Sequence, residues 1–380
     1  MDDPTTSATL RRRSDGAVAA IRAVRASAFT IPTETPESDG TLAWNATTLV
    51  VAEVQAGNQT GLGYTYTDRA ACCLIKGTLA EAIVGQDAMD VARCWWAMEA
   101  AVRNIGRQGL AAMAIAAVDV ALWDLKAKVL GLPLVDLTGR VREAVPLYGS
   151  GGFTSYRIDR LKQQLAQWAS EGFCQVKMKV GRDPEQDRER VKQARKAIGP
   201  DVALFVDANG AYSAKRALQM AQVFAAEGVS WFEEPVSSDD LAGLRFVRKR
   251  TPPGMDVAAG EYGYGPRDFE ALLDARAVDV LQADATRCGI TGFLQAGALC
   301  SGRGMPLSAH CAPALHAHLG CMVQATAHLE FFHDHARIEQ LLFDGTPRAR
   351  GGKISPDRSR PGLGLELRRQ DAERFESLGP

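Results

Sequence analysis

Four short apolar runs in the middle of the chain carry charged side chains at nearly equal intervals. The first run, residues 176–180, contains Lys177 and Lys179, and the next three end in Asp207, Glu233 and Glu261. From Lys179 onward the intervals are 26 to 28 residues, about the length of one strand, one helix and two loops. Charges at the same end of successive parallel strands meet in space, so we expect one shared site.

Three carboxylates at one point favour a hard divalent cation. Mg²⁺ prefers oxygen ligands and keeps coordination positions open for substrate. We therefore predict that Asp207, Glu233 and Glu261 bind one Mg²⁺ per active site. Such an ion would neutralise the charge that develops when the carbon beside a substrate carboxylate loses a proton. Lys179 is the candidate base, if Lys177 and the metal lower its pKa.

A second acid-base pair follows farther along the chain. Asp284 and His310 lie 26 residues apart, one strand-helix repeat, so their side chains can be neighbours. A carboxylate on one ring nitrogen fixes the tautomer and raises the basicity of the other. We expect His310 to face Lys179 across the cavity, because their strands are opposite in a closed ring of eight. Glu330, in protonated form, could donate a hydrogen bond to the enediolate.

Each motif also has an ordinary structural explanation when it is taken alone. Asp207 could belong to a turn, Glu233 could start a helix, and most of the six histidines are expected to be structural, with His316 and His318 also possible as pocket lining. The common spacing of all the motifs decides in favour of a site.

The elements that must position these residues alternate between strand and helix from Val145 onward. Eight apolar runs separated by amphipathic segments indicate eight strands, the number that closes a barrel. The predicted fold class is α/β, a modified (β/α)8-type TIM barrel with an α+β capping domain. We place the N-terminal part of the cap at residues 1–140, the barrel at 141–343, and a C-terminal segment that returns to the cap at 344–380.

The predicted cap combines antiparallel strands with helices. Strands are expected at residues 21–29, 47–54 and 63–66, with a long loop at 31–40 that contains two prolines. Three helices should follow. The last is expected at Leu110–Leu130 and is ended by Gly131 and Pro133.

Composition narrows the class of partner. With 380 residues and a net charge of −1, the chain gives no reason to expect binding to nucleic acid or to a membrane surface. No apolar run reaches about 20 residues, so we expect a cytoplasmic protein. The eight cysteines form no CxxC pair and are expected to be reduced, mainly buried and structural.

Together these residues resemble the enolase superfamily, and more narrowly its mandelate racemase/muconate lactonizing enzyme-like branch. Lys177-Met178-Lys179 resembles the family's KxK base motif. Asp284 and His310 resemble its Asp-His dyad, and Glu330 resembles its electrophilic glutamate. The metal-ligand motifs are matched by Asp207 in Asp-Ala-Asn-Gly, Glu233 in Trp-Phe-Glu-Glu-Pro and Glu261 in Gly-Glu. Asn209 in the first of these motifs is assigned to substrate binding.

The resemblance covers residues 21–367, including the helix at residues 118–126 of the cap. Departures at residues 137–140 and 288–290 touch no expected ligand. The resemblance implies that the segment from Pro32 to Asn45 closes over the barrel mouth and helps to select substrate, and that the protein forms a homo-oligomer.

The predicted function is Mg²⁺-dependent abstraction of the α-proton of a hydroxy-acid carboxylate through an enediolate. The favoured outcome is dehydration of a sugar acid to a 2-keto-3-deoxy acid, which makes the protein a hydro-lyase. The hydroxyl and acidic residues of the predicted loop, Thr33, Glu34, Ser38 and Asp39, favour a polar substrate over an aryl one. The same catalytic set would support a racemase or epimerase, or a cycloisomerase. A non-catalytic barrel that binds a metal and a carboxylate is the remaining alternative.

Overall fold

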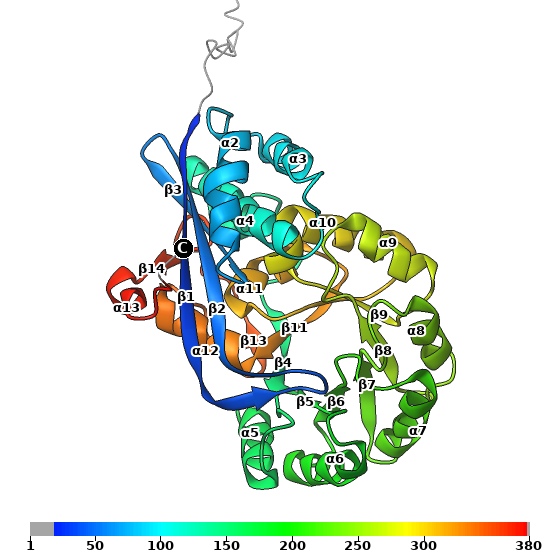
Figure 1. Ribbon diagram of the computed structural model, residues 1–380. Helices are drawn as coiled ribbons and strands as arrows, with labels where there is room; N and C mark the ends of the chain where they lie inside the picture. The colour runs from blue at the N-terminus through cyan, green and yellow to red at the C-terminus, as the bar shows by residue number, and fades with distance from the viewer. Residues whose placement is uncertain (1–18, 378–380) are drawn as a thin grey trace, which may run out of the picture.

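The computed structural model describes residues 19–377, which form a barrel and a cap domain that lies against the mouth of the barrel (Figure 1). Residues 1–18 of the predicted cap and residues 378–380 of the predicted C-terminal segment lie outside this range. Within it, no helix combines the length and the apolar character that crossing a membrane requires.

Eight parallel strands close the barrel, as predicted. They are hydrogen-bonded in the order β4 to β11, and β11 pairs again with β4. The strands are β4 (Val145–Gly151), β5 (Gln175–Lys179), β6 (Ala203–Asp207), β7 (Val229–Glu233), β8 (Asp256–Ala259), β9 (Val280–Ala283), β10 (Leu307–Ala309) and β11 (Thr326–Phe332). The helices that follow them are α5 (Ile158–Ser170), α6 (Pro184–Ile198), α7 (Ala214–Ala225), α8 (Leu241–Arg248), α9 (Pro266–Asp274), α10 (Ala285–Arg303), α11 (Pro313–Met322) and α12 (His333–Leu342).

The strand register brings the charged ends together. Lys179 pairs directly with Asp207, and Asp207 with Glu233. Glu261 differs from the prediction, because it lies two residues beyond the end of β8. Gly260 makes that turn possible: its φ is 132°, and a Cβ there would lie 2.3 Å from the carbonyl oxygen of Gln282.

An aromatic layer fills the barrel interior next to the charged ends. Phe205 and Trp231 stack with ring centroids 5.2 Å apart, and Tyr148 packs edge-on against Phe205. The Tyr148 ring also lies 5.3 Å from Nζ of Lys177. This layer keeps water from reaching the charged groups through the barrel.

The cap consists of an antiparallel sheet and helices. The sheet contains β1 (Ile21–Ser38), β2 (Ala43–Ala56) and β3 (Gln59–Tyr66). The first helical segment joins α1 (Ala71–Leu74), the π-helical turn η1 (Ile75–Leu79) and α2 (Ala80–Ile83), and α3 (Val91–Ala101) and α4 (Leu110–Leu130) follow. Helix α4 has the predicted bounds, and Gly131 ends it in the left-handed conformation. A short 3-10 turn, η2 (Leu134–Asp136), leads to the barrel.

The prediction of a loop at residues 31–40 is wrong, because β1 and β2 form a hairpin that extends through most of this segment. Pairing is interrupted between Pro32 and Glu37 and then resumes at Glu37 opposite Trp44 and at Ser38 opposite Ala43. Both prolines lie at this interruption, where a missing N–H donor is tolerated.

The tip of the β1–β2 hairpin rests on the barrel mouth (Figure 1). A Cβ added to Gly40 would lie 2.3 Å from the carbonyl oxygen of Ala208 and 2.7 Å from that of Val180. The backbone N–H of Thr154 donates to the carbonyl of Ser38 at 2.8 Å. The hairpin therefore covers one side of the mouth, where the family resemblance places it.

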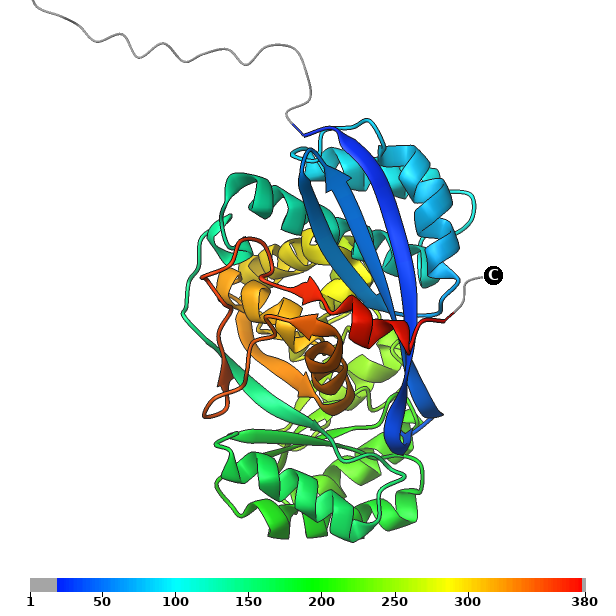
Figure 2. The same ribbon diagram turned by 90° about the vertical axis from the view of Figure 1, so that its left-hand side faces the viewer.

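The C-terminal segment runs from the barrel back to the cap (Figure 2). It contains β12 (Phe343–Asp344), which pairs with β14 (Glu366–Leu367), as well as β13 (Lys353–Ile354) and α13 (Arg369–Glu373). Strand β13 pairs with the start of β4 in the barrel. Beyond α13, Phe375 accepts a hydrogen bond from the N–H of Thr30 in β1.

Asp124 of α4 joins β3 to the C-terminal segment. Its buried carboxylate accepts hydrogen bonds from the N–H groups of Leu62 at 2.7 Å and Leu363 at 2.6 Å, and Nζ of Lys128 lies 2.6 Å away. We expect Asp124→Ala to lower the free energy of unfolding by about 2–3 kcal/mol, because buried donors lose their acceptor.

Urea unfolding of Asp124→Ala beside Asp136→Ala measures this effect. Asp136 is partly exposed and pairs with Arg140 and Arg358 at the surface, so its loss should cost less than about 1 kcal/mol. Equal losses in the two variants would contradict a special role for Asp124.

Candidate active site

Three carboxylates converge at the barrel mouth. Asp207 ends β6, Glu233 ends β7, and Glu261 follows β8. One oxygen from each lies within 4.8 Å of the other two, and all three side chains are buried. A buried set made of carboxylate oxygens alone fits a hard divalent cation such as Mg²⁺.

Two lysines offset the charge of these carboxylates. Nζ of the fully buried Lys177 lies 2.7 Å from Oε1 of Glu233 and 2.7 Å from Oε1 of Glu330. Nζ of Lys179 lies 2.5 Å from Oδ2 of Asp207. Both side chains point into the barrel mouth, as expected for positions i and i+2 of one strand.

The protein groups around Lys179 raise its pKa, whereas the predicted lowering of this pKa includes a bound metal ion. Burial lowers this pKa, but the combined attraction of Asp207, Glu233 and Glu330 outweighs burial and raises the pKa above its usual value. Repulsion from Lys177 also lowers this pKa, but by less than attraction to Asp207 raises it. A cation that shared the Asp207 carboxylate would weaken the attraction and shift the Lys179 pKa downward.

Asp284 and His310 form a hydrogen-bonded pair. Nδ1 of His310 lies 2.9 Å from Oδ2 of Asp284, and its Nε2 lies 3.1 Å from Oε2 of Glu261. Asp284 also begins α10, where its Oδ1 accepts the N–H of Thr286. Burial raises the pKa of Asp284, but the hydrogen bond to His310, together with attraction to His310, His316 and Arg287, outweighs burial and lowers that pKa to about 2.

Glu330 lies at the same mouth, between Lys177 and His310. Burial raises the pKa of this carboxyl, but attraction to Lys177 and His310 outweighs burial and moves the pKa well below its usual range. These surroundings favour the ionised form of Glu330, whereas its predicted role as a hydrogen-bond donor requires the neutral acid in the presence of metal and substrate. Its Oε2 accepts the backbone N–H of Cys311 at 3.1 Å.

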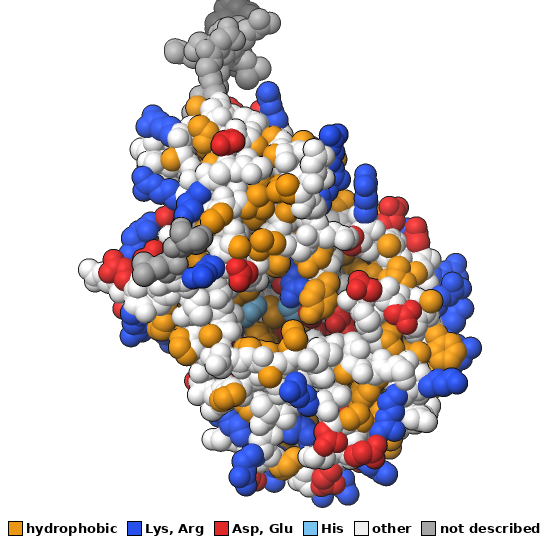
Figure 3. All heavy atoms as spheres, viewed as in Figure 1, with side chains coloured by type: hydrophobic (Ala, Val, Ile, Leu, Met, Phe, Trp, Pro, Cys, Tyr) orange, Lys and Arg blue, Asp and Glu red, His pale blue; other side chains and the backbone are white. Residues whose placement is uncertain are grey.

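Lys179 and His310 line one cavity of about 170 Å³. The space-filling view shows a hollow between cap and barrel (Figure 3). Asn209, Glu261, Asp284 and Glu330 line the cavity too. Lys177, Asp207 and Glu233 are not among the lining residues. The other lining residues are Asp39, Trp44, Tyr66, Tyr262, Thr286, Arg287, Cys311, Phe332 and His335.

The cap side of the cavity is more aromatic than predicted. Trp44 and Tyr66 come from the cap, and the Tyr66 ring stacks on His335 at 3.4 Å. Of the four polar residues expected to face substrate, only Asp39 lines the cavity. The other three have different surroundings. Oγ of Ser38 is hydrogen-bonded to Oγ1 of Thr154 at 2.6 Å, Glu34 pairs with His333 and Arg160, and Thr33 lies where the strand pairing is interrupted. The tryptophan beside the turn was the sequence signal for this wall.

The structure revises the expectations for His335 and Cys311, and it leaves His316 and His318 in the structural roles expected of them. His335 lines the cavity, although it was expected to be purely structural. His316 does not, because its ring nitrogens bond the N–H of Ala285 and the carbonyl of Cys311. His318 bonds the carbonyl of Leu363, away from the cavity. Cys311 is also more than structural, since it lines the cavity with its Sγ 3.2 Å from Nε2 of His310.

Arg287 is a cavity residue that sequence reasoning missed. Its guanidinium lies 3.8 Å from Glu261 and 3.7 Å from Asp284, and it covers the Tyr262 ring at 4.4 Å. Arg287 lies three residues after Asp284. A helix predicted to begin at Asp284 would have placed both side chains on the same face, toward the cavity. Arg287 and Lys179 supply the cavity's positive side chains within the described range.

Backbone strain is concentrated at this mouth. Five described residues other than glycine have positive φ, and four of them follow barrel strands here: Asn209, Glu234, Cys311 and Ala312. Such conformations persist only where the surrounding structure holds them, and they are common at functional sites.

Comparison with known families gives two matches along the chain. The family model described as mandelate racemase/muconate lactonizing enzyme, N-terminal domain, matches residues 25–139. The model described as enolase C-terminal domain-like matches residues 160–372.

Known proteins match over nearly the whole chain. A mandelate racemase/muconate lactonizing enzyme-like protein from Rubrobacter xylanophilus has a structure with a TM-score of 0.92 and 53% identity, covering 94% of this chain and 100% of its own. D-galactarolactone cycloisomerase from Agrobacterium fabrum is 30% identical over 95% of this chain and 100% of its own length. L-talarate dehydratase from Polaromonas sp. JS666, solved with Mg and L-glucarate, has a TM-score of 0.85 and 32% identity, covering 94% of this chain and 98% of its own.

Proposed function

The chain belongs to the mandelate racemase/muconate lactonizing enzyme-like family of the enolase superfamily, and from that premise we propose that it is a lyase that dehydrates a sugar acid. The observation that carries the proposal is the placement of Lys179 and His310 in one cavity beside three converging carboxylates. Two acid-base groups at one carbon can remove a proton and protonate a leaving hydroxyl. The talarate dehydratase with bound Mg and a sugar diacid supports this class of reaction.

We assign Asp207, Glu233 and Glu261 to Mg²⁺. Their buried oxygens are close enough to share one ion. When bound, the ion would supply Lewis-acid stabilisation of the negative charge on the substrate carboxylate. Lys177 holds Glu233 in place with a hydrogen bond at 2.7 Å.

The proton transfers fall to Lys179 and His310. One of them takes the α-proton, which breaks the C–H bond and leaves its electron pair in the enediolate. The electron pair then forms the new double bond as the β-hydroxyl leaves, and His310 protonates that hydroxyl to give water. The resulting enol tautomerises to the 2-keto-3-deoxy acid. Asp284 holds His310 through Nδ1, so Nε2 is the nitrogen that exchanges the proton.

A racemase or epimerase is the second candidate. The aromatic wall formed by Trp44, Tyr66 and Phe332 suits an aryl substituent as well as the C–H face of a sugar. With no leaving group at the β-carbon, the same two bases would only remove and return the α-proton. The cycloisomerase relative represents a third outcome of the same first step. The complete set of acid-base groups in one cavity argues against a non-catalytic barrel.

A screen of sugar acids and aryl hydroxy acids with Mg²⁺ tests the proposal. Formation of a keto acid supports dehydration. Exchange of the α-proton in D₂O with inversion and without loss of water supports racemisation and contradicts the lyase assignment. Neither reaction across a broad library would contradict both.

Mg²⁺ should stabilise the protein through the three carboxylates. At 100 times its dissociation constant, an ion that binds only the folded state adds about 2.7 kcal/mol to the free energy of unfolding. We expect an increase in melting temperature with MgCl₂ and its reversal by EDTA. Glu261→Gln should lose most of this shift. Glu227→Gln is the matched control, because Glu227 lies in the loop before β7, at the opposite end of the barrel strands. An unchanged Mg²⁺ shift in Glu261→Gln would refute the assigned ligand set.

A further inference from the structure

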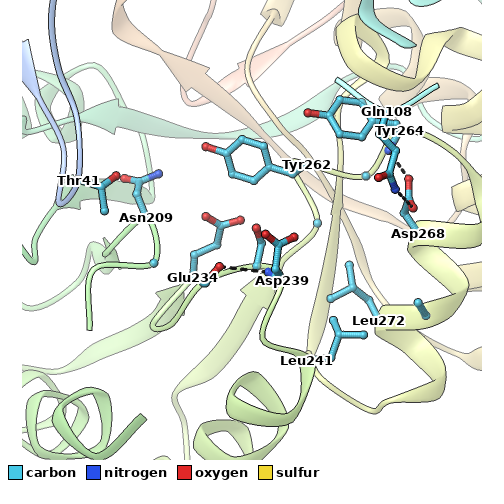
Figure 4. Close-up of a pocket in the computed structure, with 16 residues that line it drawn as sticks. Thr41, Gln108, Asn209, Glu234, Asp239, Leu241, Tyr262, Tyr264, Asp268 and Leu272 are labelled. Carbon is cyan, nitrogen blue, oxygen red and sulfur yellow. Dashed lines mark hydrogen bonds between the residues drawn. The ribbon is translucent and has the colours of Figure 1, made fainter. Parts of the chain in front are cut away.

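A second and larger chamber adjoins the reactive cavity. It has a volume of about 610 Å³ and shares two lining residues, Asn209 and Tyr262, with that cavity. In Figure 4, Asn209 and Thr41 lie at one end of the chamber, Tyr262 and Glu234 lie between the ends, and Leu241 and Leu272 form part of its wall. The loops after β6, β7 and β8 supply most of its lining. At the end away from Asn209, Nε2 of Gln108 of the cap donates to Oδ1 of Asp268 at 3.0 Å (Figure 4).

The chamber presents hydrogen-bond acceptors to its interior. Glu234 is 2% exposed, and within the described chain its Oε1 has no hydrogen-bond partner. Asn209 Oδ1 is unpartnered in the same way. A buried polar atom without a partner is costly unless something outside the chain satisfies it. Whether ionised or protonated, the Glu234 carboxyl offers an oxygen to a hydroxyl group.

The ionisable groups around the chamber are all acidic. They are Glu234, Asp239 and Asp268, and the lining residues in the described range include no lysine or arginine. Ser237, Ser238 and Tyr264 add hydroxyl groups. This lining suits an uncharged polyhydroxylated chain and repels a carboxylate.

The size of the two spaces indicates how they are used. The reactive cavity of about 170 Å³ is smaller than the roughly 300–1,000 Å³ of a typical small-molecule site. The chamber of about 610 Å³ falls within that range. A substrate with several carbons beyond the reacting pair needs room outside the reactive cavity, and the chamber is the adjoining space.

We propose that this chamber binds the uncharged, hydroxylated far end of the substrate, and that it selects sugar acids with one carboxylate over those with a carboxylate at each end. The inference rests on the proposed function and specifies its substrate class. The carboxylate beside the reacting carbon meets Lys179 and Arg287 in the reactive cavity. The far end of the chain meets hydroxyl, amide and carboxyl groups, with no lysine or arginine among the described lining residues.

The test compares an aldonate with the aldarate of the same configuration. Dissociation constants are measured by calorimetry with MgCl₂ in the Lys179→Ala background, which removes turnover from the measurement. We expect the aldonate to bind about tenfold more tightly, because the second carboxylate of the aldarate meets like charges. Equal affinities, or tighter binding of the aldarate, would overturn the inference.

Variants that change the charge at Asp239 test whether the preference for the aldonate arises in the chamber. This side chain is exposed, so substitution there should not disturb folding. Asp239→Asn should raise the aldarate-to-aldonate affinity ratio about threefold and Asp239→Arg about tenfold. Asp201→Arg is the matched control, with the same charge change at the other end of the barrel, in the exposed turn before β6. Equal ratios in Asp239→Arg and Asp201→Arg would show that the chamber does not hold the far end.

The outcome can be separated from that of the proposed function. If no sugar acid is converted by the unmodified protein, dehydration fails. The binding preference and its response at Asp239 still confirm or overturn the chamber assignment. If keto acid forms from both substrates at equal kcat/KM and equal affinity, the function stands and the chamber inference fails.

Discussion

Replacing Lys179 by alanine should lower kcat for dehydration by about 10³-fold to 10⁴-fold, and His310→Asn should cause a loss of similar size. Each change removes an acid-base group from the cavity, and neither leaves a side chain of suitable pKa in its place. The fold should survive, because both side chains face the cavity rather than the apolar core. Steady-state kinetics with MgCl₂ and circular dichroism of each variant measure the two effects.

Isotope exchange in D₂O then assigns the two roles. If Lys179 removes the proton, His310→Asn should still exchange the substrate's α-proton, and Lys179→Ala should not. The opposite pattern assigns the base to His310. Lys215→Ala, an exposed lysine on α7, is the control and should keep full activity. Full activity in both active-site variants would contradict the proposed roles of Lys179 and His310 in proton transfer.

Replacing Lys177 by methionine should cause the largest loss of stability. This ammonium group is fully buried and lies 2.7 Å from Glu233 and Glu330 and 3.5 Å from Asp207. Removing it leaves buried carboxylates without compensation, which typically costs about 3–5 kcal/mol. Methionine fills a similar volume, so the loss reports charge rather than packing.

Thermal unfolding with and without MgCl₂ measures this effect. The added ion should recover part of the loss in Lys177→Met, because it supplies positive charge to the same carboxylates. Adding Glu330→Gln to Lys177→Met should also recover part of it, since one buried charge is then removed. Lys215→Met, at the surface, should change the melting temperature little. A melting temperature of Lys177→Met equal to that of the unmodified protein would contradict the electrostatic account of the site.

The sequence determined most of the barrel and of its charged mouth. The repeat of apolar runs, each bearing a charge near its end, predicts both the eight strands and the convergence of Lys179, Asp207 and Glu233. This works because parallel strands of equal length place equivalent positions at one height of the barrel. The bounds of helix α4 could also be predicted from the sequence. Its end signal is local, because Gly131 follows directly after a long apolar run.

Local reasoning failed where the outcome depends on distant partners. The hairpin at residues 31–40 reads as a loop because its prolines are unfavourable in a strand, yet pairing with residues across the turn holds it extended. Trp44 and Tyr66 line the cavity through contacts between cap and barrel. Contacts of this kind produce no regular residue interval from which they could be predicted.

Charge states also belong to the tertiary structure. Lys179, Glu330 and His335 are the residue types that the sequence shows, but whether each is charged depends on burial and on the groups it meets. Residue spacing therefore determined which functional groups gather at the mouth. Only the folded arrangement decided which groups pair, which remain ionised and how large a space lies beside them, because electrostatic interaction and packing depend on distances of a few ångströms between residues far apart in the chain.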